Sequence, residues 1–345
     1  MMIIMRAQAT QEQIDDVVEK VEECGLQAHL SMGSERAVIG AIGDIREIRQ
    51  DRFVVLPGVD RVMPISPPYK LASREFHPQD SSFPLNGISV TRGEVLLIAG
   101  PCAVESRSQI LEAAQAVKEA GAHALRGGAF KPRTSPYSFQ GLKEEGLRYL
   151  AEARELTCLP VVTEVMSPED VPLVSRYGDV LQIGARNMQN YPLLRAVGES
   201  GRPVLLKRGM MSSIEELLLA AEHILSQGND RVMLCERGIR TFGQETRYTA
   251  DINALPVLKS LTHLPILFDP SHSTGHWEYV PAVALAGVAA GADGLLVEVH
   301  PHPGKALSDG QQSLRPERFQ ELVRRVKRVA KAVGSELIEQ KEEGS

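Results

Sequence analysis

Side chains that could hold a metal ion follow three of the short apolar runs in this chain. Cys102 follows VLLIAGP, His272 follows PILFDPS, and GLLVEVHP contains Glu298, with Asp309 in the segment after it. A thiolate, an imidazole and two carboxylates make a mixed ligand set that suits Mn²⁺, Fe²⁺, Co²⁺ or Zn²⁺ better than Mg²⁺ or Ca²⁺. The alternative interpretation is ordinary, since a single Cys is usually a small buried hydrophobe and a His in a Pro-Ser-His-Ser turn usually a loop hydrogen-bonder.

Cationic side chains end or follow several of the other apolar runs. They are Arg126, Lys131, Arg133, Arg186, Lys207 and Arg237. Charges of one sign repel when they converge, and an anionic ligand offsets that cost. Each cation taken alone could be a solvated loop charge or the partner of an acid such as Glu164 or Glu236. Six of them at strand ends instead predict a pocket for a strongly anionic substrate, or for two.

Two lysines of this set support a rival chemistry. Lys131 or Lys207 could form a Schiff base with a carbonyl substrate if burial lowered its pKa. That interpretation leaves Cys102, His272, Glu298 and Asp309 without a role. His300 and His302 lie close by in HPHP, and we interpret them as supporting or loop residues rather than ligands.

Composition excludes several classes of protein. The chain has 345 residues, is 43% hydrophobic and 24% charged, and carries a net charge of −6, which argues against general nucleic-acid binding. No apolar run approaches the roughly 18 residues of a membrane span. The four cysteines are far apart, without a CxxC pair, and MMIIMRAQAT does not resemble a secretory signal. We therefore expect a cytoplasmic protein that binds neither membranes nor nucleic acids.

From residue 88 onward, buried strands alternate with amphipathic helices. The predicted strands are 95–101, 123–128, 160–165, 180–185, 203–209, 231–238, 265–271 and 294–301. Continuous apolar runs are typical of parallel strands covered on both faces, and eight such units in about 250 residues match a (β/α)8 TIM barrel. A doubly wound sheet is the rival, but the chain has no GxGxxG loop. The prediction is an α/β barrel over 88–338, followed by a polar tail over 339–345.

The first 66 residues have a different pattern. Strand, helix, two strands, helix and strand follow one another, with the second helix predicted over 44–58. This is the order of a small ferredoxin-like α+β domain. Residues 67–87 are rich in Pro and Ser and lack periodicity, so we expect a linker between the two domains.

The barrel sequence resembles the 3-deoxy-D-arabino-heptulosonate-7-phosphate (DAHP) synthases, in the short-barrel type Iβ branch with an N-terminal ferredoxin-like domain. The matching stretches are IAGPCAVES, LRGGAFKPRTSPYSFQG, QIGARNMQN, VLLKRGM, LCERGIRTF, DPSHSTG and VEVHPHPGKALSDGQQSL. A sister family, which uses arabinose 5-phosphate, carries an Asn-containing version of KPRT. The residues Lys131-Pro132-Arg133-Thr134 therefore favour erythrose 4-phosphate.

The resemblance implies a role for each candidate residue. Cys102, His272, Glu298 and Asp309 match the ligands of one divalent metal per subunit. The set Arg126, Lys131, Gly184, Ala185, Arg186, Lys207 and Arg237 matches the phosphoenolpyruvate site, and Pro132, Arg133 and Thr134 match the erythrose 4-phosphate contacts. The candidate catalytic residues are Lys131, Cys102, His272, Glu164 and Asp269. Among them, Lys131, Glu164 and Asp269 are the candidate proton carriers, and the choice between these three stays open.

The resemblance also implies metal-dependent condensation of the two substrates at the head of the shikimate pathway, with feedback control by an aromatic amino acid. His29 and Ser31 alternate on one predicted strand, so they share a face and are the candidate effector contacts in an ACT-like regulatory domain. A solvated strand edge is the alternative. Pairing of small domains would make a homodimer or homotetramer. Besides a Schiff-base aldolase, the remaining rival is a non-catalytic phosphometabolite sensor. The metal, the inhibitor, the oligomer size and association with a chorismate mutase stay open.

Overall fold

The chain folds into two compact units, Met1–Pro68 and Tyr69–Ser345. This computed structural model describes residues 1–345 except 34–35, 44–47, 50, 64–67, 132–136 and 339–345. Within the described ranges, no helix combines the length and the apolar character needed to cross a membrane.

The first unit is a four-stranded antiparallel sheet with helices on one face. Its elements are β1 (Met2–Met5), α1 (Gln11–Glu23), β2 (Gln27–Met32), β3 (Ala37–Ile42), α2 (Asp51–Val54) and β4 (Val59–Met63). The strand order β2-β3-β1-β4 is that of a ferredoxin-like domain, which confirms the predicted fold. Ile3, Val17, Ile39 and Phe53 form its core between sheet and helices.

The two helices of this unit differ in how well the sequence predicts them. Thr10 caps α1, because its Oγ1 accepts from Gln13 N at 3.3 Å and Gln13 Oε1 accepts from Thr10 N at 3.1 Å. The helix predicted over 44–58 is helical only at Asp51–Val54 within its described part. It stops early because the chain turns at Leu56, whose N–H donates to Phe53 O, before Gly58 at φ +81°.

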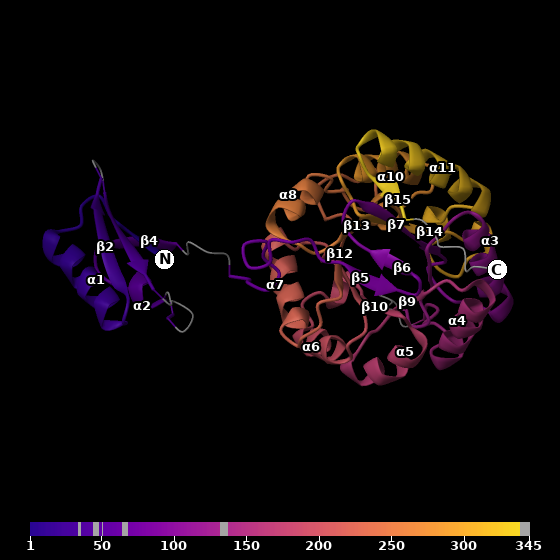
Figure 1. Cartoon of the computed structure of the whole chain (residues 1–345), viewed down its shortest axis with the longest axis horizontal. Coiled ribbons are helices and arrows are strands. Elements are labelled where there is room, and N and C mark those ends of the chain that lie inside the picture. The colour runs from indigo at the N-terminus through magenta and orange to yellow at the C-terminus, as the bar shows by residue number, and fades with distance from the viewer. Residues whose placement is uncertain (34–35, 44–47, 50, 64–67, 132–136, 339–345) are drawn as a thin grey trace. The chain divides into compact units, whose positions relative to one another are not determined.

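The second unit is the predicted eight-stranded parallel barrel. Its strands are β7 (Glu94–Gly100), β8 (Ala124–Arg126), β9 (Val161–Glu164), β10 (Val180–Ile183), β11 (Val204–Lys207), β12 (Val232–Glu236), β13 (Ile266–Phe268) and β14 (Gly294–Glu298). Each strand pairs with the next in parallel, and β14 pairs with β7 to close the ring (Figure 1). The TIM-barrel prediction is confirmed.

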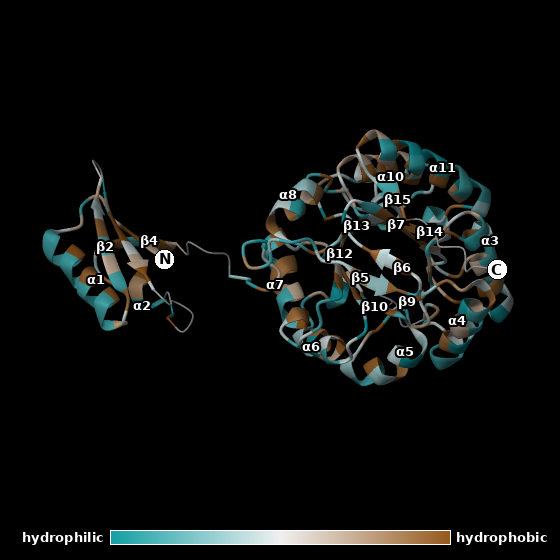
Figure 2. Ribbon diagram, viewed as in Figure 1, coloured by the Kyte–Doolittle hydropathy of each residue, from teal (hydrophilic) through white to brown (hydrophobic). Residues whose placement is uncertain are grey.

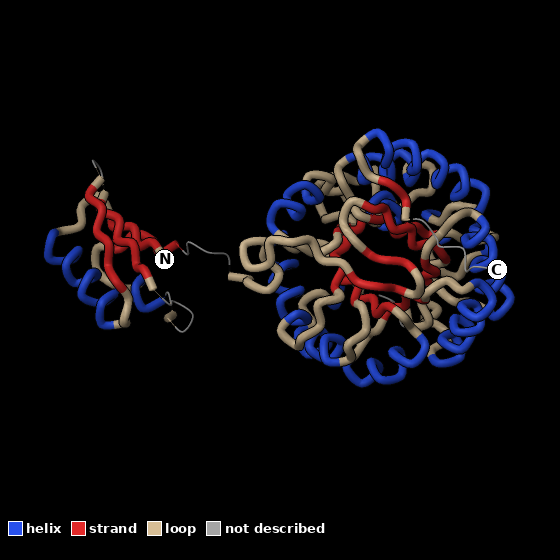
Figure 3. Tube along the Cα trace, in the orientation of Figure 1, coloured by secondary structure: helices blue, strands red, loops and turns tan. Residues whose placement is uncertain are grey.

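Helices surround the ring of strands (Figure 3). They are α3 (Arg107–Glu119), α4 (Glu144–Thr157), α5 (Val171–Tyr177), α6 (Tyr191–Glu199), α7 (Ile214–Leu225), α8 (Ala254–Leu261), α9 (Pro270–Thr274), α10 (Val280–Ala289) and α11 (Pro316–Ala332). In Figure 2 the outward surfaces of helices such as α4 and α11 are hydrophilic, as expected for helices that bury one apolar stripe. The helix and strand side chains between them form one continuous core.

A short hairpin fills one end of the barrel. Strands β5 (Phe83–Leu85) and β6 (Ile88–Val90) pair in antiparallel fashion, and their side chains pack with the inward-facing residues of the barrel strands. Ala124 and Val180, the first residues of β8 and β10, belong to this cluster. The hairpin therefore covers the end at which the strands begin, and it crosses the centre of the ring in Figure 1.

The segment expected as a linker is in large part attached to the barrel. The backbone N–H groups of Lys70, Leu71 and Ala72 all donate to the Glu222 carboxylate at 2.9–3.0 Å. Arg74 N donates to Leu261 O. Residues from Tyr69 onward therefore belong to the second unit, and strand β15 (Glu336–Leu337) adds a parallel pairing to β7 at the other end of the chain.

Candidate active site

The cavity at the open end of the barrel gathers most of the residues singled out from the sequence. It has a volume of about 170 Å³ and is lined by Arg126, Lys131, Glu164, Gln182, Gly184, Ala185, Arg186, Lys207, Met210, Arg237, Arg247, Tyr248, His272 and Asp309. Five of the six predicted cations are in this set. The sixth, Arg133, lies outside the described residues together with Pro132 and Thr134.

The parallel strands explain why these side chains meet. Arg126, Glu164 and Lys207 are the last residues of β8, β9 and β11. Carboxyl ends of parallel barrel strands share one rim, so groups far apart in sequence face a common space. Gly184 follows β10, and a Cβ there would collide with Glu164 Oε1, so a larger residue at this position would displace that carboxylate.

Two buried ion pairs tie the cations to the floor of the cavity. Arg126 Nη1 donates to Glu298 Oε1 at 2.9 Å, and Lys207 Nζ donates to Asp269 Oδ2 at 2.5 Å. Burial raises the pKa of Asp269, but the neighbouring His272 and Lys207 outweigh it and hold that pKa well below its usual range. Asp269 is therefore a carboxylate that holds Lys207 in place. The alternative that a cation pairs with a neighbouring acid thus applies to Lys207, but its partner is Asp269 and not Glu164 or Glu236.

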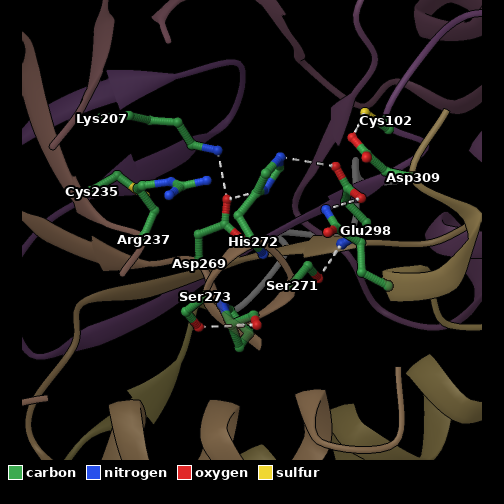
Figure 4. A network of polar contacts seen from close by, with 12 residues as sticks. Cys102, Lys207, Cys235, Arg237, Asp269, Ser271, His272, Ser273, Glu298 and Asp309 are labelled. Atoms are coloured by element: carbon green, nitrogen blue, oxygen red, sulfur yellow. Dashed lines mark hydrogen bonds and ion pairs between the residues drawn. The ribbon is translucent and has the colours of Figure 1, made fainter. Parts of the chain in front are cut away.

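His272 lies between the cationic and acidic parts of the site (Figure 4). It belongs to α9, whose first turn is capped by the Asp269 side chain. Its Nδ1 lies 2.7 Å from Asp269 Oδ2 and its Nε2 lies 3.4 Å from Glu298 Oε1. Burial lowers the pKa of His272 to about 4, against the opposing effect of Asp269, so the ring is neutral near pH 7 and can act as a ligand.

Three of the four predicted metal ligands converge. One ligand atom from each of Cys102, Glu298 and Asp309 lies within 4.8 Å of the others, and Cys102 Sγ is 3.0 Å from Asp309 Oδ2. His272 is outside this group of three but reaches Glu298 through Nε2. Burial, followed by the charge of Glu298, raises the pKa of the Cys102 thiol to about 12. A deprotonatable thiol packed against two carboxylates fits a divalent cation, which would neutralise their mutual repulsion.

Lys131 lies between the cationic residues that line the cavity and the cluster formed by Cys102, Glu298 and Asp309. Its Nζ lies 3.0 Å from Cys102 O and 3.1 Å from Cys102 Sγ. Burial lowers the pKa of Lys131, but Cys102 and Glu164 outweigh that effect and the net change is upward. The amine is thus protonated near neutral pH, which favours a charge-donating role over that of a Schiff-base nucleophile.

Several residues of the site were not singled out from the sequence. Arg247 and Tyr248 come from the long segment after β12, and the Arg237 guanidinium lies over the Tyr248 ring at 4.0 Å from its centroid. Gln312 donates to Glu298 Oε2 at 2.7 Å. Arg247 lies in a segment without periodicity, but its charge beside an aromatic residue in ETRYTAD was a usable signal.

Other candidates occupy different positions. His300 Nε2 lies 3.4 Å from Glu105 Oε2 and His302 Nε2 lies 3.5 Å from Glu112 Oε1, so both are outside the three-residue group. Glu236 pairs with Arg208 at 2.8 Å instead of with a lining cation. His29 and Ser31 lie on β2 opposite Gly40 and Val38 of β3, which places them on one face of the small sheet.

Comparisons with known proteins agree with this arrangement. Residues 78–334 match the model of the DAHP synthetase I family, and residues 1–67 match the DAHP synthase ferredoxin-like domain. A phospho-2-dehydro-3-deoxyheptonate aldolase of Thermotoga maritima is 51% identical over 334 residues, covering 97% of this chain and 99% of that protein. A 2-dehydro-3-deoxyphosphooctonate aldolase of Acidithiobacillus ferrooxidans is 36% identical over 66% of this chain and 86% of its own length.

A solved structure supports the same relationship. The crystal structure of the DAHP synthase of Thermotoga maritima superposes with a TM-score of 0.93 at 50% identity, covering 97% of this chain and 98% of that one. The likeness therefore extends over both units and not the barrel alone. The chain belongs to the DAHP synthase family, in the group that carries an N-terminal ferredoxin-like domain.

Proposed function

We propose that this enzyme condenses phosphoenolpyruvate with erythrose 4-phosphate and water to DAHP and phosphate, in a metal-dependent reaction. The observation that carries the proposal is one cavity lined by six cationic side chains, next to a cluster of two carboxylates and a thiol. Identity of 51% with a relative named for this reaction, against 36% with one named for the eight-carbon sugar acid, supports the choice of sugar. A cavity lined by this many cationic side chains suits two phosphorylated substrates that must be held in contact.

The cations would bind phosphoenolpyruvate and neutralise it. Arg186 and Arg237 present planar forks for phosphate, and Lys207 presents a point charge fixed by Asp269. Arg126 is held by Glu298 on the cavity floor, where it would reach the carboxylate or phosphate of the substrate. Holding C3 against the aldehyde carbon of the second substrate is the main contribution of these residues.

Cys102, His272, Glu298 and Asp309 would hold the divalent cation. When bound, it would supply Lewis-acid polarisation of the aldehyde oxygen. C3 of phosphoenolpyruvate would form a bond to the aldehyde carbon of erythrose 4-phosphate. Positive charge would develop at C2 of phosphoenolpyruvate, and water would add there. The hemiketal loses phosphate by C–O cleavage. We propose that Lys131, whose Nζ lies 3.1 Å from Cys102 Sγ, donates a proton to the developing alkoxide, and that Glu164, which lines the same cavity, accepts one from the water.

The test of this reaction follows phosphoenolpyruvate absorbance with erythrose 4-phosphate, before and after EDTA and after Mn²⁺ is restored. Activity should disappear with EDTA and return with Mn²⁺. Cys102→Ser should abolish the Mn²⁺ response, whereas Cys158→Ser, an exposed cysteine outside the cavity, should keep it. If the enzyme used arabinose 5-phosphate but not erythrose 4-phosphate, arabinose 5-phosphate would be its sugar substrate instead. No turnover of either sugar by metal-loaded protein would refute the synthase function and favour a sensor.

For the first 66 residues we propose a regulatory domain that responds to an aromatic amino acid. The face of the sheet opposite the helices carries His29 and Ser31 beside the apolar side chains Met2 and Met63, which are 37% and 40% exposed. A ring with a charged amino-acid group would match apolar and polar contacts on one surface. We further propose that two such domains pair, in a homodimer or homotetramer.

Inhibition assays test the regulatory proposal. Tyrosine or phenylalanine should inhibit the full chain, and His29→Ala with Ser31→Ala should remove the inhibition without lowering uninhibited activity. Glu19→Ala, on the exposed side of α1, is the matched control. Equal inhibition of all variants would place the effector elsewhere. Light scattering with and without the effector measures the oligomer size.

A further inference from the structure

We infer that Arg247 and Gln312 are positioning residues that orient the carboxylates of Glu298 and Asp309 toward the metal. The inference rests on the proposed function, since it concerns the same metal site. Neither residue was singled out from the sequence, and they come from segments on either side of α9 and β14.

Gln312 connects the two partners through a buried amide. Its exposed fraction is 2%, its Nε2 donates to Glu298 Oε2 at 2.7 Å, and its Oε1 accepts from Arg247 Nη1 at 2.8 Å. A carboxylate only accepts hydrogen bonds and a guanidinium only donates them. The amide therefore has a single satisfactory orientation, with its NH₂ on Glu298 and its oxygen on Arg247.

Arg247 holds the second carboxylate with the same nitrogen. Its Nη1 lies 3.2 Å from Asp309 Oδ1. The other oxygens face inward, because Asp309 Oδ2 is 3.0 Å from Cys102 Sγ and Glu298 Oε1 is 3.4 Å from His272 Nε2. Each carboxylate is thus held by its outer oxygen while its inner oxygen faces another candidate ligand. Glu298 Oε1 also accepts from Arg126 Nη1 at 2.9 Å, so Gln312 and Arg126 together fix this carboxylate. Partners of this kind restrict ligand rotation and raise metal affinity.

The backbone keeps Arg247 in place. Its N–H donates to Thr274 O at 3.0 Å, and the N–H of Tyr248 donates to Ser273 O at 2.9 Å. Both acceptors belong to α9, the helix that carries His272. A bridge between Ile239 and Thr249 closes the same segment on itself. The segment is therefore attached to the element that supplies the imidazole, which favours a fixed position over an adaptable one.

A substrate-binding role for Arg247 is the competing explanation. Arg247 lines the cavity and its side chain is 36% exposed, so a phosphate could reach it. The two explanations differ in what they change. Loss of a substrate contact raises KM, whereas loss of a positioning contact weakens metal binding even when no substrate is present.

The experiment measures Co²⁺ binding to the metal-free full chain by the absorption of the Cys102 thiolate–Co²⁺ pair. Gln312→Met and Arg247→Met should each weaken Co²⁺ binding by about 10- to 100-fold. The matched controls Gln311→Met and Arg240→Met change exposed neighbours and should bind Co²⁺ like the parent chain. Arg247→Lys, which keeps a donor, should recover part of the loss. With Co²⁺ at saturation, KM for phosphoenolpyruvate should not change in Gln312→Met, because Gln312 is not among the residues that line the substrate cavity.

Three results would overturn the inference, and they are distinguishable. Unchanged Co²⁺ binding in both Met variants, with a raised KM, would make Arg247 a substrate-binding residue and leave the metal site intact. Unchanged binding and unchanged KM would remove any role for the pair. Absence of Co²⁺ binding by the parent chain would refute the proposed metal dependence itself. Arg247 is partly exposed, so its variants test the pair even if replacing the buried Gln312 prevents folding.

Discussion

Asp269 holds His272 through both of its carboxylate oxygens. Oδ1 accepts from the His272 backbone N–H at 2.9 Å, and Oδ2 lies 2.7 Å from Nδ1 of the ring. Oδ2 also accepts from Lys207 Nζ at 2.5 Å. Because a carboxylate can only accept, Nδ1 must carry the proton, and Nε2 presents its lone pair toward Glu298 and the proposed metal.

Replacing Asp269 by Asn should therefore damage the metal and the substrate halves together. The amide can no longer select the ring tautomer, and Lys207 loses its buried counter-charge. We expect metal affinity to fall about 10- to 100-fold and kcat/KM to fall further. Co²⁺ titration and steady-state kinetics measure the two effects. Asp179→Asn, which loses the Arg154 ion pair outside the cavity, is the control. Asp269→Asn with full Co²⁺ affinity would show that the tautomer is set by another group.

Borohydride should fail to trap a substrate adduct on the enzyme. A Schiff base needs a neutral amine, but Cys102 and Glu164 hold the pKa of Lys131 above its ordinary value despite its burial. Lys207 is likewise paired with Asp269. Intact-protein mass spectrometry after incubation with each substrate and borohydride is the measurement. A mass increase that Lys131→Met or Lys207→Met removes would support the Schiff-base aldolase instead.

Metal binding should strengthen with pH. The pKa of Cys102 is raised to about 12, so the thiol is protonated in the metal-free enzyme, while His272, with a pKa of about 4, is already neutral. Asp309 is already a carboxylate, since its hydrogen bond from Cys102 and the charge of Arg247 outweigh burial and hold its pKa low. Binding then releases one proton, and affinity rises about tenfold per pH unit.

Co²⁺ titrations between about pH 6.5 and 8.5 measure how affinity changes with pH. This whole pH range lies below the pKa of the Cys102 thiol. Lowering the pH favours the protonated thiol and so weakens binding. Cys102→Ser should bind Co²⁺ more weakly at every pH. A parent chain with no slope would show that Cys102 is not a ligand.

Tyr248 should matter through its ring and not through its hydroxyl. The Arg237 guanidinium lies over the ring at 4.0 Å, and burial lowers the pKa of Arg237 while Asp269 and Tyr248 oppose that effect. Tyr248→Phe keeps the stacking surface and should change KM for phosphoenolpyruvate little. Tyr248→Ala frees Arg237 and should raise KM by roughly 5- to 30-fold, equivalent to about 1–2 kcal/mol. Equal KM values in the two variants would refute the stacking role.

The barrel was predictable from the sequence because its strands are buried on both faces. VLLIAGP is a continuous apolar run and PVVTEV is apolar at four of its six positions, and such runs indicate parallel strands without help from distant residues. The rule that chemistry lies at strand ends then located Arg126, Lys207 and Glu298 before any contact was known. Local pattern and a single topological rule were sufficient there.

Features that depend on long-range contacts were not predictable. Arg247 reaches Asp309 across 62 positions of the chain, and no periodicity marks the segment that carries it. The β5–β6 hairpin is not among the predicted strands: β5 lies in the Pro- and Ser-rich segment 67–87 expected as a linker, and β6 lies just after it. The Asn86-Gly87 pair between Phe-Pro-Leu and Ile-Ser-Val was the available signal, since Asn-Gly favours tight hairpin turns.

The hairpin at the closed end has a consequence for how the chain can be divided. Phe83, Leu85 and Val90 contribute to the barrel interior, whereas the core of the first unit contains no residue beyond Val62 among those described. A protein that starts at Tyr69 keeps the hairpin that covers the closed end of the barrel. It should therefore fold and convert its substrates without the first unit. One that starts after Val90 would expose the barrel lining to water. The boundary of independent folding therefore precedes the barrel's first strand by a full hairpin, and any exchange of the first unit for another domain would have to keep that hairpin with the barrel.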